Sequence, residues 1–137
     1  MTTEKFILPP QPDQDSKPYW EYLSKHKAHL QKCQKCGRFR FPPYLSCPHC
    51  GELGGDWTPI SGRGKVYSWI VIQHPVDPRL ATEVPFIVAL VELEEGVRMT
   101  GRLVGIERDE LKGDMPVKAR YDDIDSAFTL INFDPVK

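Results

Sequence analysis

All four cysteines of the chain lie within residues 33–51, CQKCGRFRFPPYLSCPHCG, as two C-x-x-C pairs with ten residues between them. Two thiolates from one tight turn supply half of the tetrahedral ligand set that Zn²⁺ prefers, and a second turn completes it. A glycine follows each pair, at Gly37 and Gly51, where a positive φ lets backbone N–H groups face the sulfurs. The spacing therefore predicts a metal site formed by Cys33, Cys36, Cys47 and Cys50.

The predicted role of this metal is structural. Cysteine fills all four positions, so no position is left open for a catalytic water. A rubredoxin-like iron site uses similar turns, and spacing does not distinguish Zn²⁺ from iron. A thioredoxin-type redox motif is disfavoured, because neither pair stands at a helix start in a βαβ setting. We expect residues 37–46 to form a short hairpin with Pro42-Pro43 near its turn, and His49 to point outward.

The composition of the chain and the pattern of its first residues predict a cytoplasmic protein. The chain has 137 residues, 27% of them charged, and no stretch approaches the roughly 18 apolar residues of a membrane span. Its first residues lack the pattern of a secretory signal. In the cytoplasm thiols stay reduced, and paired C-x-x-C motifs hold metal more often than disulfides. A net charge of −1 gives no overall attraction to nucleic acid or to an anionic membrane.

A run of cations surrounds the first cysteine pair. Residues 25–40 contain no acid and six basic residues, which are Lys25, Lys27, Lys32, Lys35, Arg38 and Arg40. Four thiolates on one Zn²⁺ leave two negative charges, which nearby cations would offset. The alternative is a binding site for a phosphate-bearing ligand or for an acidic surface of a partner, and both interpretations stay open.

The segment before the cysteines is expected to be an arm. Residues 7–18 are proline-rich and polar, which predicts an extended lead-in. Residues 18–31 place apolar side chains on one face, which predicts an amphipathic helix that a break near residues 24–27 could divide, with Ser16 as its cap. Tyr19, Trp20 and Tyr22 either pack on the neighbouring domain or form an exposed patch for a partner.

The second half of the chain reads as a small barrel. Strands are predicted at residues 65–73, 86–93, 97–104, 116–121 and 128–133, with a long loop at 74–85 and a short helix or turn at 106–115. Five short strands with a break after the third match an OB-fold Greek-key barrel. The predicted class is mainly β, divided into a helical arm at 1–31, a rubredoxin-like zinc ribbon at 32–60 and the barrel at 61–137.

The order of motifs resembles one family. The motifs are a helical arm, C-x-x-C-G, PP-x-x-x-C-P-x-C-G, SGRGKVYSW, PFIVALVELEEGVRMTGRLVG and GDMPVKARYDD. Over residues 16–135 the chain is similar to the acyl-CoA-associated zinc-ribbon/OB-fold family, domain-of-unknown-function family 35. The resemblance implies a non-catalytic chain that assembles with thiolase-fold enzymes or MaoC-type hydratases. Its arm and barrel loops would face the partner or CoA.

The residues themselves offer no catalytic constellation, because no nucleophile has an adjacent base and orienting group in a recognisable pattern. We therefore expect an accessory subunit of an acyl-CoA-metabolising complex rather than an enzyme. Its candidate contacts with CoA phosphates are Arg38, Arg40 and Arg63, and its candidate contacts with the partner are Tyr19, Trp20, Tyr22 and His74.

Two other function classes stay open. One is a stand-alone acyl-CoA-binding protein. The other is a ribbon-plus-barrel protein that binds single-stranded nucleic acid, because Tyr67 and Trp69 share a strand face and could stack bases. The acidic barrel half, with 10 basic and 13 acidic residues over 61–137, disfavours nucleic acid, and core or interface packing is the preferred use of the two aromatics.

Overall fold

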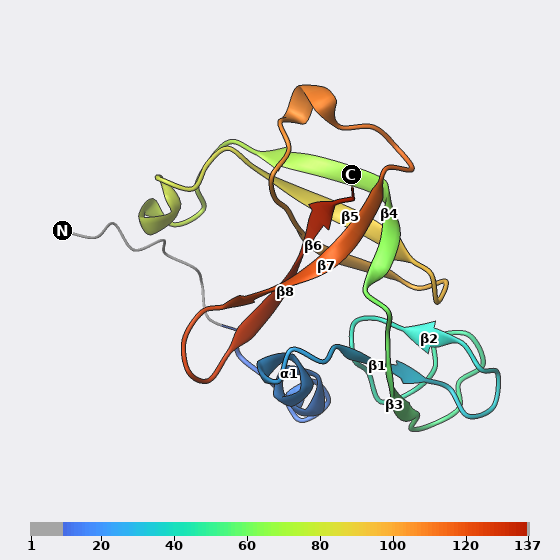
Figure 1. Cartoon of the computed structure of the whole chain (residues 1–137). Helices are drawn as coiled ribbons and strands as arrows, with labels where there is room; N and C mark the ends of the chain where they lie inside the picture. The colour runs from blue at the N-terminus through green and yellow to red at the C-terminus, as the bar shows by residue number, and fades with distance from the viewer. Residues whose placement is uncertain (1–9, 137) are drawn as a thin grey trace.

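The computed structural model describes residues 10–136, and it is mainly β with one α-helix (Figure 1). The chain begins with α1 (Lys17–Ser24), which precedes a three-stranded sheet and a five-stranded barrel. The sheet contains β1 (His29–Lys32), β2 (Phe39–Arg40) and β3 (Asp56–Pro59); the barrel contains β4 (Arg63–Ile72), β5 (Phe86–Leu93), β6 (Arg98–Leu103), β7 (Pro116–Asp123) and β8 (Thr129–Pro135). This architecture confirms the predicted fold class.

Helix α1 is shorter than the sequence pattern predicts. Pro18 lies in its first turn, where a missing N–H costs nothing. Ser16 occupies the N-cap position, but its hydroxyl accepts from the Asp13 N–H at 3.0 Å and makes no cap hydrogen bond to the helix. The helix ends at Ser24, and His26 takes a positive φ of 57° that turns the chain into β1. The prediction of helix through residue 31 is therefore wrong beyond this turn.

The ribbon sheet has the order β2-β1-β3, with both pairs antiparallel. The hairpin predicted within residues 37–46 is wrong, because β2 pairs with β1, with Gln31 opposite Arg40. Strand β1 also pairs with β3, where Leu30 lies opposite Thr58. These partners lie beyond the local segment, and they hold residues 29–32 extended where the apolar spacing alone indicated a helix.

The barrel closes in the order β4-β5-β6-β8-β7, and the predicted OB-type barrel is confirmed. All neighbouring strands are antiparallel except β6 and β8, which meet at Leu103 and Phe133. Close approach at this crossing requires a glycine, since a Cβ on Gly101 would lie 3.0 Å from the Phe133 ring. The long loop carries a short 3₁₀ turn, Pro78–Leu80, and the segment before β7 carries another, Arg108–Glu110.

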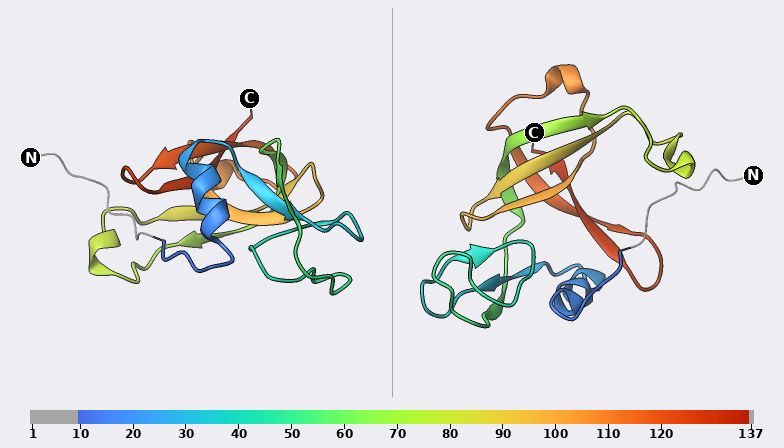
Figure 2. Two further views of the ribbon diagram at one scale, coloured as in Figure 1. Left: turned by 90° about the horizontal axis from the view of Figure 1, so that it is seen from below. Right: turned by 180° about the vertical axis from the view of Figure 1, so that it is seen from behind.

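Helix α1, the helical part of the predicted arm, packs against the barrel. Tyr19 and Leu23 of α1 are buried in the same hydrophobic cluster as the inward side chains of the barrel. Trp20 meets the ring of Phe128, in the β7–β8 loop, edge to face at a centroid distance of 6.2 Å. The two further views show α1 and the ribbon sheet beside each other at one end of the barrel (Figure 2).

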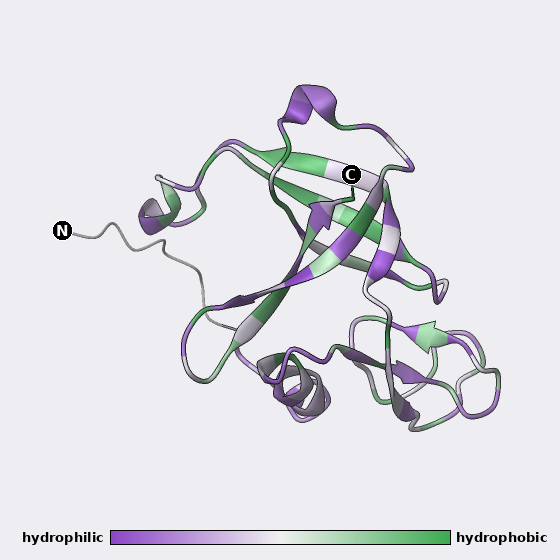
Figure 3. Cartoon of the chain, viewed as in Figure 1, coloured by the Kyte–Doolittle hydropathy of each residue, from purple (hydrophilic) through white to green (hydrophobic). Residues whose placement is uncertain are grey.

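Strand β5 is apolar on both of its faces. Its inward residues, such as Ile87 and Val91, are buried, and its outward residues Phe86, Val88 and Leu90 are half-buried. The hydropathy colouring shows β4 and β5 with green segments on the barrel wall (Figure 3). A strand with apolar residues on both faces is typical of a sheet that is covered on both sides, and the outer face of this wall is therefore a candidate contact surface.

Candidate metal centre

The four cysteine sulfurs gather at one point of the ribbon. All four Sγ atoms lie within 4.8 Å of one another. The Cys33 and Cys50 sulfurs are 3.6 Å apart, as are those of Cys36 and Cys47. These separations far exceed a disulfide bond of about 2.05 Å. They approach the roughly 3.8 Å between thiolates arranged tetrahedrally at about 2.3 Å from one ion. The residues present fit a four-thiolate metal site.

Two knuckles of the same geometry hold the sulfurs. The Gly37 N–H donates to the Cys33 carbonyl at 3.0 Å, and the Gly51 N–H donates to the Cys47 carbonyl at 2.9 Å. Both glycines adopt a positive φ, 75° and 81°, as their place after each C-x-x-C pair predicts. The Cys36 N–H lies 3.5 Å from the Cys33 sulfur. The two glycine N–H groups thus close the turns on carbonyl oxygens, whereas the Cys36 N–H faces a sulfur and favours the thiolate of Cys33 over the thiol.

The sulfurs do not titrate alike. The N–H of Cys36 is the main cause that lowers the pKa of Cys33 to about 6. The N–H of Glu52 lowers the pKa of Cys50, but burial and the neighbouring sulfurs outweigh it and raise that pKa to about 11. One thiolate therefore suppresses the ionisation of its neighbour. The four sulfurs therefore do not ionise together, and metal binding, which needs thiolates, displaces protons from the cluster.

A buried guanidinium supports the loops around this site. Arg40 is only 3% exposed, and its Nη2 donates to the Gly54 carbonyl at 2.7 Å and to the Tyr44 carbonyl at 2.9 Å. Its Nε donates to Oε1 of Gln31 at 3.2 Å. The expectation that Arg40 meets CoA phosphates is therefore wrong, because its side chain lies inside the ribbon. Sequence reasoning missed the role of Gln31, which no local pattern indicates.

Comparison with known proteins places these features in a family. Residues 30–54 match the family model described as "ChsH2, rubredoxin-like zinc ribbon domain", and residues 57–122 match "ChsH2, C-terminal OB-fold domain". The chain is 38% identical over 95 residues to a "DUF35 domain-containing scaffold protein" of Methanothermobacter thermautotrophicus, covering 68% of this chain and 71% of that protein. The chain belongs to the DUF35 family. The family resemblance found in the sequence is thereby confirmed.

Other relatives of this DUF35 chain are subunits of CoA-thioester enzymes. It is 40% identical over 130 residues to the "Probable enoyl-CoA hydratase alpha subunit" of Thermomonospora curvata, covering 93% of this chain but 40% of that protein. It is 38% identical over 74 residues to the "Benzoylsuccinyl-CoA thiolase subunit BbsA" of Geobacter metallireducens, covering 54% of this chain and 48% of that one. The chain thus spans less than half the length of these two relatives.

A solved structure resembles nearly the whole DUF35 chain. The structure described as "Ltp2-ChsH2(DUF35) aldolase" contains a chain that superposes with a TM-score of 0.82 at 39% identity. The match covers 93% of this chain and 98% of that chain. The similarity therefore includes the ribbon and the barrel together, and not only one of them.

The other predicted CoA contacts of the DUF35 chain are exposed. Arg38 lies on the ribbon with its Nη1 3.2 Å from Nδ1 of His49, and His49 is exposed as expected. Arg63 lies at the start of β4, and its Nε donates to Oε1 of Glu94 at 3.0 Å. The two arginines stand on different units, the ribbon and the barrel, so they do not form one local cluster with the buried Arg40.

The predicted partner-contact residues differ in accessibility. Tyr19 is 5% exposed and belongs to the core, so the first interpretation, packing, is correct for this residue and partner contact is wrong. Trp20 and Tyr22 are half-buried, and Tyr22 stacks on His29 at a centroid distance of 3.7 Å. His74 is exposed in the long loop. Trp20, Tyr22 and His74 therefore retain surface for a partner.

Most of the exposed large apolar side chains of the described residues stand at two places on the DUF35 chain, and Val136 stands apart from them after β8. One is the tip of the ribbon, and the other is β4 with the loop that follows it. The exposed residues are Tyr44, Leu45 and Leu53 on the ribbon, and Tyr67, Trp69, Ile70 and Val76 on the barrel. Tyr67 and Trp69 are 50% and 37% exposed, so their packing in the core is wrong, while their packing in an interface stays a prediction. A register shift in β4 lies between Val66 and Ser68. The Arg98 guanidinium lies over the Tyr67 ring at 3.6 Å.

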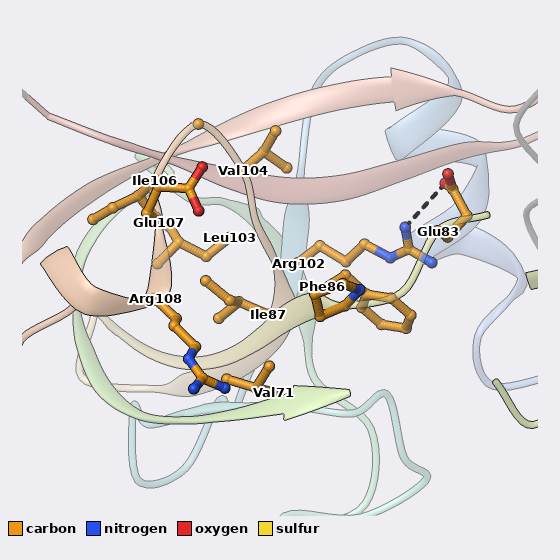
Figure 4. Close-up of a pocket in the computed structure, with 12 residues that line it drawn as sticks. Val71, Glu83, Phe86, Ile87, Arg102, Leu103, Val104, Ile106, Glu107 and Arg108 are labelled. Atoms are coloured by element: carbon orange, nitrogen blue, oxygen red, sulfur yellow. Dashed lines mark hydrogen bonds and ion pairs between the residues drawn. The ribbon is translucent and has the colours of Figure 1, made fainter. Parts of the chain in front are cut away.

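A cavity at the end of the barrel escaped sequence reasoning. Its lining combines the end of the long loop, parts of β4, β5 and β6, and the segment after β6 (Figure 4). Arg102 and Arg108 are its basic residues, and Glu83 and Glu107 its acidic ones. The only signal in the sequence was the alternation of apolar and polar residues over 97–104, which placed one face of that strand outside the core.

Over residues 10–136, no helix has the length and apolar composition to cross a membrane.

Proposed function

We propose that this DUF35 chain is a non-catalytic accessory subunit of a thiolase-like or related acyl-CoA-metabolising complex. The observation that carries the proposal is a structural similarity. The ribbon and the barrel together resemble a chain of the structure described as "Ltp2-ChsH2(DUF35) aldolase", a description that names two components. The names of the hydratase and thiolase relatives support it, since each is a subunit of an enzyme that acts on a CoA thioester. The scaffold name of the Methanothermobacter relative supports the non-catalytic role.

The metal we propose is a structural Zn²⁺. Four thiolates close the coordination sphere and leave no position for a substrate. Binding would fix both knuckles, and with them the loop that carries Tyr44 and Leu45 and the loop that carries Leu53. A rigid ribbon tip presents these apolar side chains without the entropy cost of ordering them on association. The metal would act on partner binding through this surface.

The partner we propose is a thiolase-fold enzyme, and the related alternative is a MaoC-type hydratase. Two exposed apolar surfaces on the chain suit a protein partner, because interface cores are rich in aromatic and aliphatic residues. The first is the ribbon tip and the second is the wall formed by β4 and β5. Arg38 and Arg63 are our candidates for contact with the phosphates of CoA, since arginine binds phosphate through paired N–H groups.

The side chains of the described region favour a supporting role over catalysis. Over residues 10–136, the only ion pair that involves a histidine joins Nε2 of His26 to Oδ1 of Asp123 at 2.9 Å. The nearby Thr129 hydroxyl donates to Asp123 at 2.6 Å, and not to the histidine. A hydroxyl nucleophile needs a base to take its proton. The acceptor of the Thr129 hydroxyl is a carboxylate whose pKa is lowered, first by Thr129 and then by His26, so Asp123 is a weak base for activating this hydroxyl.

Reconstitution tests the proposal. Thiolase-fold and MaoC-type proteins of the host would be expressed with and without the zinc-loaded DUF35 chain, and acyl-CoA turnover would be measured for each. We expect no turnover by the chain alone and a gain in soluble, active enzyme for one partner. The Cys36→Ser variant serves as the matched control with an incomplete ligand set. Turnover by the isolated chain, or partners indifferent to its presence, would refute the proposal.

A further inference from the structure

The cavity at the end of the barrel has a volume of about 290 Å³. It lies between the loop that joins β4 to β5 and the segment that follows β6 (Figure 4). Clefts for small ligands start at roughly this size and are commonly found at the mouths of β-barrels. The surroundings of this cavity must therefore decide which chemistry it suits.

Three strands supply an apolar floor. Val71 of β4 lies opposite Ile87 of β5, and Ile87 lies opposite Leu103 of β6. Side chains opposite one another across neighbouring strands point to the same face. The three therefore form one row across the sheet, and Ile106 extends it from the following loop. An apolar row of this kind favours an aliphatic chain over a polar ligand.

One of the two arginines is already committed to the protein. Nη1 of Arg102 is 3.4 Å from Oε1 of Glu83, whose side chain is only 8% exposed. The same guanidinium lies over the Phe86 ring at 3.9 Å. Glu83 and Arg102 neutralise each other, so this wall of the cavity attracts neither an anion nor a cation strongly.

The other arginine is available. The only carboxylate that contacts Arg108 within residues 10–136 belongs to its neighbour Asp109, at 4.0 Å, and the Arg108 side chain is 60% exposed. Its guanidinium extends toward Val71, whereas Glu107 lies near Ile106 (Figure 4). The cavity thus has a cation at one edge and an acid at the other. An anionic head would sit at Arg108 and avoid Glu107.

We propose that this cavity binds an aliphatic carboxylate of about eight carbons. Its carboxylate would pair with Arg108, and its chain would lie over Val71, Ile87 and Leu103. Liquid water occupies about 30 Å³ per molecule, so the cavity holds about ten non-hydrogen atoms, which is the size of octanoate. The site goes beyond the proposed accessory role and does not depend on it, because every lining residue belongs to this one chain.

Methyl-resolved NMR of the full zinc-loaded chain tests the site, with four probes of matched length or charge. We expect octanoate to shift the methyl signals of Val71, Ile87 and Leu103 saturably, and to bind about tenfold more tightly than 1-octanol, since a carboxylate–guanidinium hydrogen bond is charge-assisted. Octylamine should bind more weakly than the alcohol, and acetate should not saturate. Equal affinities for octanoate, octanol and octylamine, or no saturable shifts with octanoate, would overturn the proposal.

Two variants locate the anion. Arg108→Gln should reduce octanoate affinity about tenfold to the level of octanol, and should leave the octanol affinity unchanged. Arg108→Lys should restore part of the loss, because a point cation remains. Arg98→Gln is the matched control, since Arg98 lies at the other end of β6 and does not line the cavity. Unchanged octanoate binding in Arg108→Gln, or an equal loss in Arg98→Gln, would contradict the assignment.

Discussion

Arg40 and Gln31 face each other across the β1–β2 pair, with Nε of Arg40 donating to Oε1 of Gln31 inside the ribbon. The same Gln31 oxygen accepts from the Tyr44 N–H at 2.8 Å. Gly55 makes room for the guanidinium, because a Cβ there would lie 3.1 Å from Nη1 of Arg40. One buried cation thus joins β1, β2 and the two loops near the candidate metal site.

Removal of this cation should weaken the ribbon. Arg40→Leu deletes the donors to the Tyr44 and Gly54 carbonyls, and buried acceptors without donors are costly, so we expect a loss of about 2–4 kcal/mol in the free energy of unfolding. Denaturant titration of the zinc-loaded protein measures it. Arg38→Gln, on the exposed face of the same ribbon, is the control and should stay within about 0.5 kcal/mol. Equal stability of the two variants would show that Arg40 does not support the fold.

Loss of one cysteine sulfur should disorder the ribbon and leave the barrel folded. In Cys47→Ser the ligand set is incomplete, so we expect loss of bound zinc and of ordered ribbon signals, while barrel amides keep their positions. Metal analysis and amide NMR spectra report the two effects, and partner affinity should fall with the ribbon signals. Addition of a strong chelator to the wild-type chain provides the comparison. A variant without metal that bound its partner as tightly as the wild type would show that zinc is not needed for partner binding.

A single methyl group should strain the barrel at Gly64. Its Cβ would lie 2.5 Å from the Glu92 carbonyl oxygen, which is backbone and cannot rotate away. Gly64→Ala should therefore cost about 1–3 kcal/mol, as overpacking does, and lower the melting temperature. Gly113→Ala is the matched substitution, with no atom within 4 Å of the new Cβ. If the two alanine variants melted together, the close approach of β4 and β5 described here would be incorrect.

The stabilisation that Asp123 provides through Thr129 and His26 should be lost at low pH. The Thr129 hydroxyl, followed by His26, lowers the pKa of Asp123 below its ordinary value. The folded chain then binds fewer protons than the unfolded chain, so this stabilisation is present above an ordinary aspartate pKa of about 3.9 and is lost as the pH falls through the lower folded value.

Thr129→Val removes the main donor and should move the pKa of Asp123 upward, which carboxyl carbon NMR can follow. The pKa of Asp77, which is lowered to about 2 mainly by the Arg79 side chain, should not move and provides the internal control. An unchanged Asp123 pKa in the variant would mean that the threonine does not hold the carboxylate.

Local patterns were sufficient for much of this fold. The candidate metal ligands follow from cysteine spacing, and the barrel strands follow from runs such as residues 86–93, where β-branched and aliphatic side chains leave little choice of structure. Each predicted strand overlaps an observed strand. The turn after each C-x-x-C pair follows from the conformational freedom of Gly37 and Gly51.

What the sequence could not indicate depends on partners far along the chain. Leu30 suits one face of a helix as well as it suits a strand, and only pairing with Thr58 decides between them. Arg40 belongs to a basic run and looked exposed, but loop carbonyls that no local pattern reveals bury it. The cavity is formed by segments from Val71 to Arg108, and no short window contains them together.

The most direct test of the accessory role is affinity capture of the tagged, zinc-loaded chain from its native host, with quantitative mass spectrometry of what is retained. We predict a thiolase-fold or hydratase protein at a fixed stoichiometry that survives size-exclusion chromatography and is lost with the Cys47→Ser chain. A wild-type chain recovered alone, with the ribbon intact and zinc bound, would contradict the account.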